Sequence, residues 1–199
     1  MSSDGTGGEK PQKETLRGNE TPSPKLILKW LGIILGLSVA TLILVGLVLP
    51  REWHVELSVE VEGETEQIHA LVGDLERWHE WMFDPDQDAT GMRVEATGSG
   101  VGASIHWQGG GSNGQMTLVE SDPNTGVAWD GMIETDDINN HGTIRYEALP
   151  EQGKVRVTLV DEGTLPPIVG GYFVPVMNAS LGQHFEAALA RLEQAVENP

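Results

Sequence analysis

The N-terminal part of the chain consists of a polar segment followed by a long apolar run. Residues 1–24 are rich in Ser, Thr, Gly, Pro, Glu and Lys and contain no aromatic residue. Such a segment buries too little apolar surface to offset its ordering entropy, so it predicts a disordered tail. Residues 31–49 then carry no charge over 19 positions. As a helix this run is about 28 Å long, close to the hydrocarbon thickness of a bilayer, and it predicts a transmembrane helix over residues 26–49.

Two other interpretations of the apolar run fit its pattern less well. A buried core helix normally has a polar stripe, and here only Ser38 and Thr41 interrupt the apolar positions. A cleaved signal peptide is the stronger alternative. The run is longer than the usual apolar region of such peptides, about 7–15 residues, and no small-residue cleavage site follows it. We therefore expect a retained anchor.

The charges on either side of the run predict its orientation. Five Lys and Arg residues precede it, whereas only Arg51 follows it before Arg77. Because positive flanks stay in the cytoplasm, we expect a single-pass protein of the cell membrane. Its N-terminus would be cytoplasmic and its C-terminal domain extracytoplasmic.

Beyond residue 51 the hydrophobic period changes to two. Apolar residues from Trp53 to Val61 alternate with polar ones, which predicts a half-buried strand that Gly63 ends. Two short helices are expected at residues 64–72 and 74–82, with Thr65 and Asp74 as N-caps. Six strand-like stretches follow, at residues 93–98, 103–108, 115–121, 126–134, 143–149 and 154–162.

The C-terminal segment is helical in pattern. After Pro175 one apolar stripe recurs at spacings of three and four, which predicts a helix of about 20 residues facing a sheet. Turn residues at 122–124 and 150–153 predict antiparallel pairing of the strands beside them. Strands grouped together with helices at the ends indicate an α+β fold, with helices on one face of an antiparallel sheet.

Charge and cysteine content exclude several classes of function. The chain has 12 Lys+Arg and 30 Asp+Glu, and of these 7 and 26 follow residue 50, a net charge of −19 for that part. So acidic a domain is a poor partner for nucleic acid and is repelled by anionic headgroups. The absence of cysteine excludes disulfides, thiolate metal sites and Cys nucleophiles.

Four short strings carry a resemblance to a known family. They are the DLERWHEW string at residues 74–81, Gly100-Val101-Gly102-Ala103 with Trp107, residues 114–117 followed by 120–123, and Gly182 with Phe185-Glu186 and residues 189–192. In order and spacing they resemble the START-related, polyketide cyclase-like (SRPBCC) superfamily over residues 53–197. The resemblance implies a helix-grip fold, in which a curved sheet wraps a long C-terminal helix around an apolar cavity. Members bind lipids, sterols or polyketides, and some are cyclases or hydratases.

Large apolar side chains are the candidate ligand contacts, since flat and flexible groups suit an irregular apolar ligand. The same side chains also suit a plain packed core. The predicted cavity residues are Trp78, Trp81, Phe83, Trp107, Trp129, Met132, Tyr146, Phe173, Met177, Leu181 and Phe185.

No catalytic residue, metal site or cofactor is predicted. The acidic positions 84, 86, 88 and 95 follow a calcium-loop spacing, but Ala89 stands where that loop needs glycine, so they indicate an acidic surface loop. The glycines at 109, 111 and 114 lie between two strands, which excludes a dinucleotide fingerprint.

The sequence thus predicts a membrane-anchored binding module for a hydrophobic small molecule or lipid. The alternative is a polyketide cyclase- or hydratase-like enzyme in the same cavity, for which His184 with Glu162 or Arg145 is the candidate acid–base pair. A third possibility is a domain without a ligand, whose acidic surface contacts another protein.

Overall fold

The computed structural model describes residues 23–83, 91–134 and 138–197. Most of the predicted tail, and the acidic positions 84, 86 and 88, lie outside the described residues. The chain divides into two compact units, residues 1–40 and 41–199.

The apolar run forms helix α1 (Pro24–Val48). The helix begins two residues earlier than the predicted span of residues 26–49, and it ends one residue earlier than that span. In the part of the chain that the structure describes, this is the one helix long and apolar enough to cross a membrane. Of its residues, only Gly46 is buried. The helix is compatible with a single-pass anchor or with a signal sequence.

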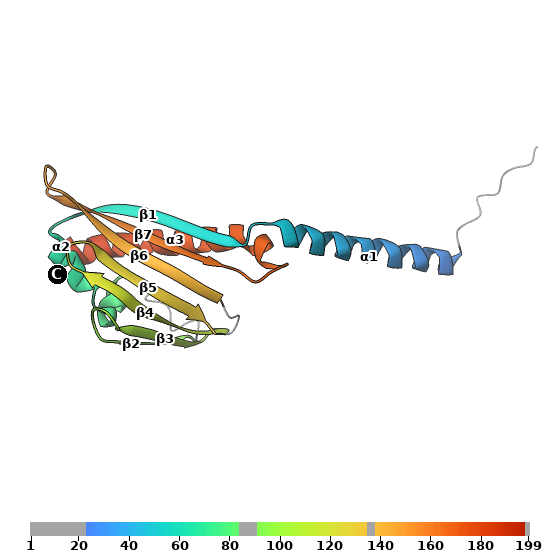
Figure 1. Cartoon of the computed structure of the whole chain (residues 1–199), viewed down its shortest axis with the longest axis horizontal. Coiled ribbons are helices and arrows are strands. Elements are labelled where there is room, and N and C mark those ends of the chain that lie inside the picture. The colour runs from blue at the N-terminus through green and yellow to red at the C-terminus, as the bar shows by residue number, and fades with distance from the viewer. Residues whose placement is uncertain (1–22, 84–90, 135–137, 198–199) are drawn as a thin grey trace, which may run out of the picture. The chain divides into compact units, whose positions relative to one another are not determined.

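A seven-stranded antiparallel sheet forms most of the second unit, with the strand order β1-β7-β6-β5-β4-β3-β2 (Figure 1). All strands predicted from alternation are present, which confirms the α+β helix-grip class. Strand β6 begins five residues earlier than expected. The bounds are β1 Glu52–Glu62, β2 Arg93–Thr97, β3 Ser104–Gly109, β4 Ser112–Asp122, β5 Gly126–Ile133, β6 Ile138–Leu149 and β7 Lys154–Thr164.

Two short helices, α2 (Thr65–Val72) and η1 (Leu75–Glu80), follow β1 as predicted. Asp74 caps η1, since its carboxylate accepts a 3.0 Å hydrogen bond from the Glu76 backbone. The predicted cap Thr65 is wrong, because Glu64 holds that position and its backbone N–H donates to the Gln67 side chain. Also, η1 is a 3₁₀ helix, a form typical of such short segments.

The long C-terminal helix α3 (Gly170–Glu197) starts before Pro175 rather than after it. Proline has a helical φ, and near a helix start it removes only one backbone hydrogen bond, so the helix continues through it. The predicted stripe is buried at Phe185, Ala188, Leu189 and Leu192. Arg191 fastens α3 to the end of η1, where its side chain donates to the backbone oxygens of Trp81 and Met82.

The strand register divides the sheet into an inner face, packed toward α3, and an outer face. Val55, Leu159 and Trp129 belong to the main core and therefore mark the inner face. Three inner tryptophans stand opposite glycines on neighbouring strands, and each indole fills the space that a glycine Cβ would occupy. These pairs are Trp53 with Gly163, Trp129 with Gly142, and Trp107 with Gly114. Covering a strand glycine with an aromatic ring compensates for its missing side chain.

Candidate functional site

Five of the predicted cavity residues lie in the packed core. They are Trp78, Trp81, Trp129, Tyr146 and Phe185, each at most 8% exposed. The Trp78 ring packs edge-on against Trp81 at 5.4 Å between centroids and against Trp129 at 5.7 Å. This cluster lies where η1 meets the sheet, and the ligand-contact role predicted for these residues stays a prediction.

Four other predicted cavity residues face the interior but are only half buried. Phe83, Trp107 and Leu181 pack on the edge of the main core, and Met177 packs on a smaller cluster around Trp53 and Leu165. The sequence did not single out Val94 and Met116, which are half buried on the same inner face. We call this set the inner wall: Phe83, Val94, Trp107, Met116, Met177 and Leu181.

The remaining two predicted residues lie apart from the inner wall. Met132 follows Gly131 on β5, and the alternation that turns Trp129 inward turns Met132 to the outer face. Phe173 lies in the first turn of α3 with 59% of its surface exposed. The structure therefore does not bring all eleven residues together.

One carboxylate is buried on the inner face. Asp161 of β7 is 5% exposed, and it accepts hydrogen bonds from the Trp53 indole at 2.9 Å and the Asn140 amide at 2.8 Å. Burial is the main cause that raises the pKa of this carboxyl group, and the two hydrogen bonds oppose the rise. A buried acid with satisfied oxygens gives the interior one polar point among apolar side chains.

A second polar group ties α2 to the sheet. His69 lies between the Tyr146 hydroxyl at 3.3 Å and the Ser121 hydroxyl at 3.2 Å. Burial lowers the pKa of His69 and raises that of Tyr146, so both groups are neutral at pH 7. A neutral imidazole donates to one hydroxyl and accepts from the other, which suits a structural role.

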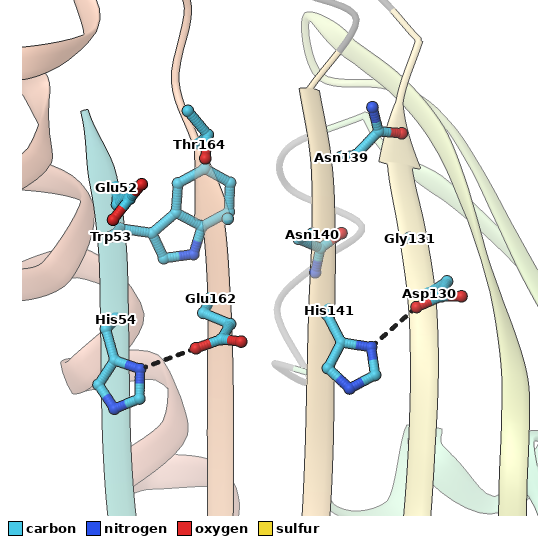
Figure 2. A pocket seen from close by; sticks show the side chains of 11 residues that line it. Glu52, Trp53, His54, Asp130, Gly131, Asn139, Asn140, His141, Glu162 and Thr164 are labelled. Atoms are coloured by element: carbon cyan, nitrogen blue, oxygen red, sulfur yellow. Dashed lines mark hydrogen bonds and ion pairs between the residues drawn. The ribbon is translucent and has the colours of Figure 1, made fainter.

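The outer face carries a row of histidines and carboxylates across four strands. His54 donates from Nδ1 to Glu162 at 3.2 Å, and His141 donates from Nδ1 to Asp130 at 2.8 Å. Figure 2 shows the two pairs side by side along β1, β7, β6 and β5. They border an open trough of about 930 Å³. Each of these side chains is about half exposed, so such pairs contribute little to stability. Among the described residues no group of His, Asp or Glu is arranged to hold a metal ion.

The candidate acid–base pair of the enzyme alternative is not assembled. Glu162 lies on the outer face with His54, and Arg145 pairs with Glu120 on that face at 3.0 Å. His184 is on α3, beside Phe185, on the other side of the sheet. The sheet therefore separates the histidine from both proposed partners.

This sheet, with its terminal helix and inner apolar wall, corresponds to a known family. The family model described as polyketide cyclase/dehydrase and lipid transport matches residues 52–197. The chain belongs to this family. The resemblance drawn from the tryptophan and glycine strings is thereby confirmed.

Several solved structures of other proteins share this fold at low sequence identity. Protein CV1439 from Chromobacterium violaceum is 15% identical, with 73% of this chain and 98% of that one covered and a TM-score of 0.54. The Aha1 dimer from Colwellia psychrerythraea is 14% identical, with 73% and 96% covered and a TM-score of 0.54. DynU16, described as a putative protein of the dynemicin biosynthetic locus, is 15% identical, with 73% and 47% covered and a TM-score of 0.51. No curated protein matches the chain.

Proposed function

We propose that this protein is a membrane-anchored binding module that holds a hydrophobic small molecule or lipid between its sheet and α3. Membership of a family described by polyketide cyclases, dehydrases and lipid transport supports an apolar ligand. The separation of His184 from Glu162 and Arg145 favours binding over catalysis.

The half-buried inner wall is the observation that carries this proposal. Six apolar side chains face the interior from β2, β3, β4, α3 and the segment after η1, yet none of them is fully covered. A fully packed interior would bury them, because burial of apolar surface stabilises a protein by about 25 cal/mol per Å². A hydrophobic ligand lying against the inner wall would cover the same apolar surface, and this burial would stabilise the complex. Asp161 and Asn140 lie on the same face and suit a polar end of the ligand.

The anchor keeps this domain next to the lipid. Only Leu49, Pro50 and Arg51 separate α1 from β1, and at about 3.3 Å per residue such a link spans roughly 10 Å. The basic residues before the uncharged run support a cytoplasmic N-terminus and a binding domain on the other side of the membrane. The acidic surface of the domain favours neutral over anionic lipids.

Native mass spectrometry of the full-length protein, released from a mild detergent, tests this function. We expect a bound hydrophobic molecule that stays with the protein through purification. Met116→Glu places a charge on the inner wall, and Val119→Glu places one on an exposed position of the same strand. The bound mass should disappear with Met116→Glu and persist with Val119→Glu, both variants being checked for folding by circular dichroism. No bound mass in the unmodified protein, or equal retention in both variants, contradicts the proposal.

A further inference from the structure

An exposed apolar ridge lies at the start of α3. It comprises Ile168, Val169, Tyr172, Phe173 and Val176, each between 38% and 64% exposed. Among the described residues, seven large apolar side chains outside α1 are this exposed, and five of them are in this ridge. The other two, Val101 and Val119, are on different segments. A concentrated exposed apolar patch marks a contact surface, whereas scattered ones need no explanation.

The ridge packs beside the last two turns of α1. The Tyr172 hydroxyl donates a 2.7 Å hydrogen bond to the Leu42 backbone oxygen. Gly46 is buried under Ile168 and Tyr172: a Cβ there would lie 2.9 Å from the Ile168 carbonyl carbon and 3.0 Å from the Tyr172 ring. The ridge is therefore continuous with an apolar helix end whose other side chains, such as Leu44 and Leu47, are exposed.

The ridge itself carries no charge, and the nearest charged side chain that contacts its segment is Arg51, which donates to the Leu165 backbone oxygen. No Asp, Glu, Lys or Arg occurs between Glu162 and Glu186, although the part of the chain after residue 50 carries a net charge of −19. The exposed side of α3 becomes small and polar beyond Val176, at Ala179, Ser180 and Gln183. The exposed apolar surface is thus confined to the start of α3.

The level of the contact along α1 indicates what covers the ridge. Leu42 precedes Val48 by six residues, about 9 Å along a helix. If the uncharged run ends at the membrane surface, Tyr172 lies about that far inside the lipid. Interfacial helices insert their apolar face by about 5–10 Å, and tyrosine is enriched at membrane–water interfaces.

We propose that the ridge inserts into the outer leaflet and forms a second membrane contact beside α1. The inference rests on the proposed function, because it requires α1 to be a retained anchor. Met177 of the inner wall directly follows Val176, so the insertion places the binding site against the lipid from which a ligand would enter. The occupant is the lipid surface itself, and neutral headgroups suit the uncharged ridge.

Site-directed spin labelling tests the insertion, and the absence of cysteine makes single labels straightforward. The full-length protein is labelled at Phe173→Cys or Val176→Cys and reconstituted in phosphatidylcholine vesicles. Leu35→Cys reports on α1, and Val119→Cys is the matched exposed control. Collision rates with oxygen and with a water-soluble nickel complex are measured. We expect the two ridge labels to resemble the α1 label, with high oxygen and low nickel accessibility, and the control to show the reverse.

Three outcomes overturn the inference, and they are distinguishable. Ridge labels as accessible to nickel as Val119→Cys, with a lipid-exposed Leu35→Cys, refute the insertion and leave the anchor intact. A nickel-accessible Leu35→Cys refutes the anchor and, with it, the proposed function. The third outcome is low nickel accessibility of the ridge labels together with spin–spin broadening that dilution with unlabelled protein removes. It would indicate that a second copy of the chain covers the ridge.

Discussion

Replacing Gly142 by alanine tests whether the buried tryptophans are a packed core or the lining of a cavity. A Cβ at Gly142 would lie 2.7 Å from Cη2 of Trp129, and two other ring atoms would be closer still. Ordinary contact begins at 3.4 Å, so the indole must move by more than about 0.7 Å. Trp129 is 4% exposed, and its ring packs edge-on against Trp78, so in a packed core this movement meets a neighbouring ring. Overpacking of this kind costs about 1–3 kcal/mol.

The matched control is Gly182→Ala, the same chemical change on α3, where a Cβ meets nothing within 4 Å. Alanine there should stabilise the protein by about 0.4–1 kcal/mol, because it lowers the entropy of the unfolded chain and favours helix. Denaturation of the full-length protein in detergent, followed by tryptophan near-UV circular dichroism, measures both changes. At about 2–4 °C per kcal/mol, Gly142→Ala should lower the melting temperature by about 2–12 °C. A loss under about 0.5 kcal/mol would mean that the Trp129 ring swings into empty space, and the core interpretation would be wrong.

Three further substitutions have defined outcomes. Burial raises the pKa of Asp161, so above about pH 4 the folded protein keeps a proton that the unfolded chain has lost, and stability falls with pH until the folded group ionises. Asp161→Asn should remove this pH dependence of the free energy of unfolding, which is at most about 1.4 kcal/mol per pH unit. Denaturation curves of both proteins, compared between pH 4 and pH 8, measure the difference. Gly46→Ala should lower the melting temperature in detergent, whereas Gly36→Ala, whose Cβ meets nothing, should not; equal effects would contradict the packing of α3 on α1. Trp107→Ala should reduce the fraction of protein that carries a bound hydrophobic molecule in native spectra, whereas Val119→Ala, outside the inner wall and the ridge, should leave that fraction unchanged.

Most of the fold could be predicted from the order of residues along the chain. The alternation from Trp53 to Val61 is strong because one face of β1 is buried and the other is solvated. The stripe from Phe185 to Leu192 is strong for the same reason on a helix. The start of β6 was missed because Asn139, Asn140 and Gly142 have low strand propensity. These residues pair in the sheet since Asn140 bonds to Asp161 and Gly142 makes room for Trp129.

The elements, the charge distribution and the apolar stretch that predicts an anchor follow from the order of amino acids alone, because these features depend on neighbours along the chain. Which large apolar side chains are buried and which remain half exposed depends on how the sheet and the helices pack. Trp129 and Met132 are three residues apart on β5, yet the pleat sends them to opposite faces. The pairing of His54 with Glu162 and the contact of Tyr172 with Leu42 join segments more than 100 residues apart. Such proximity follows from strand register and helix packing, which no local pattern encodes.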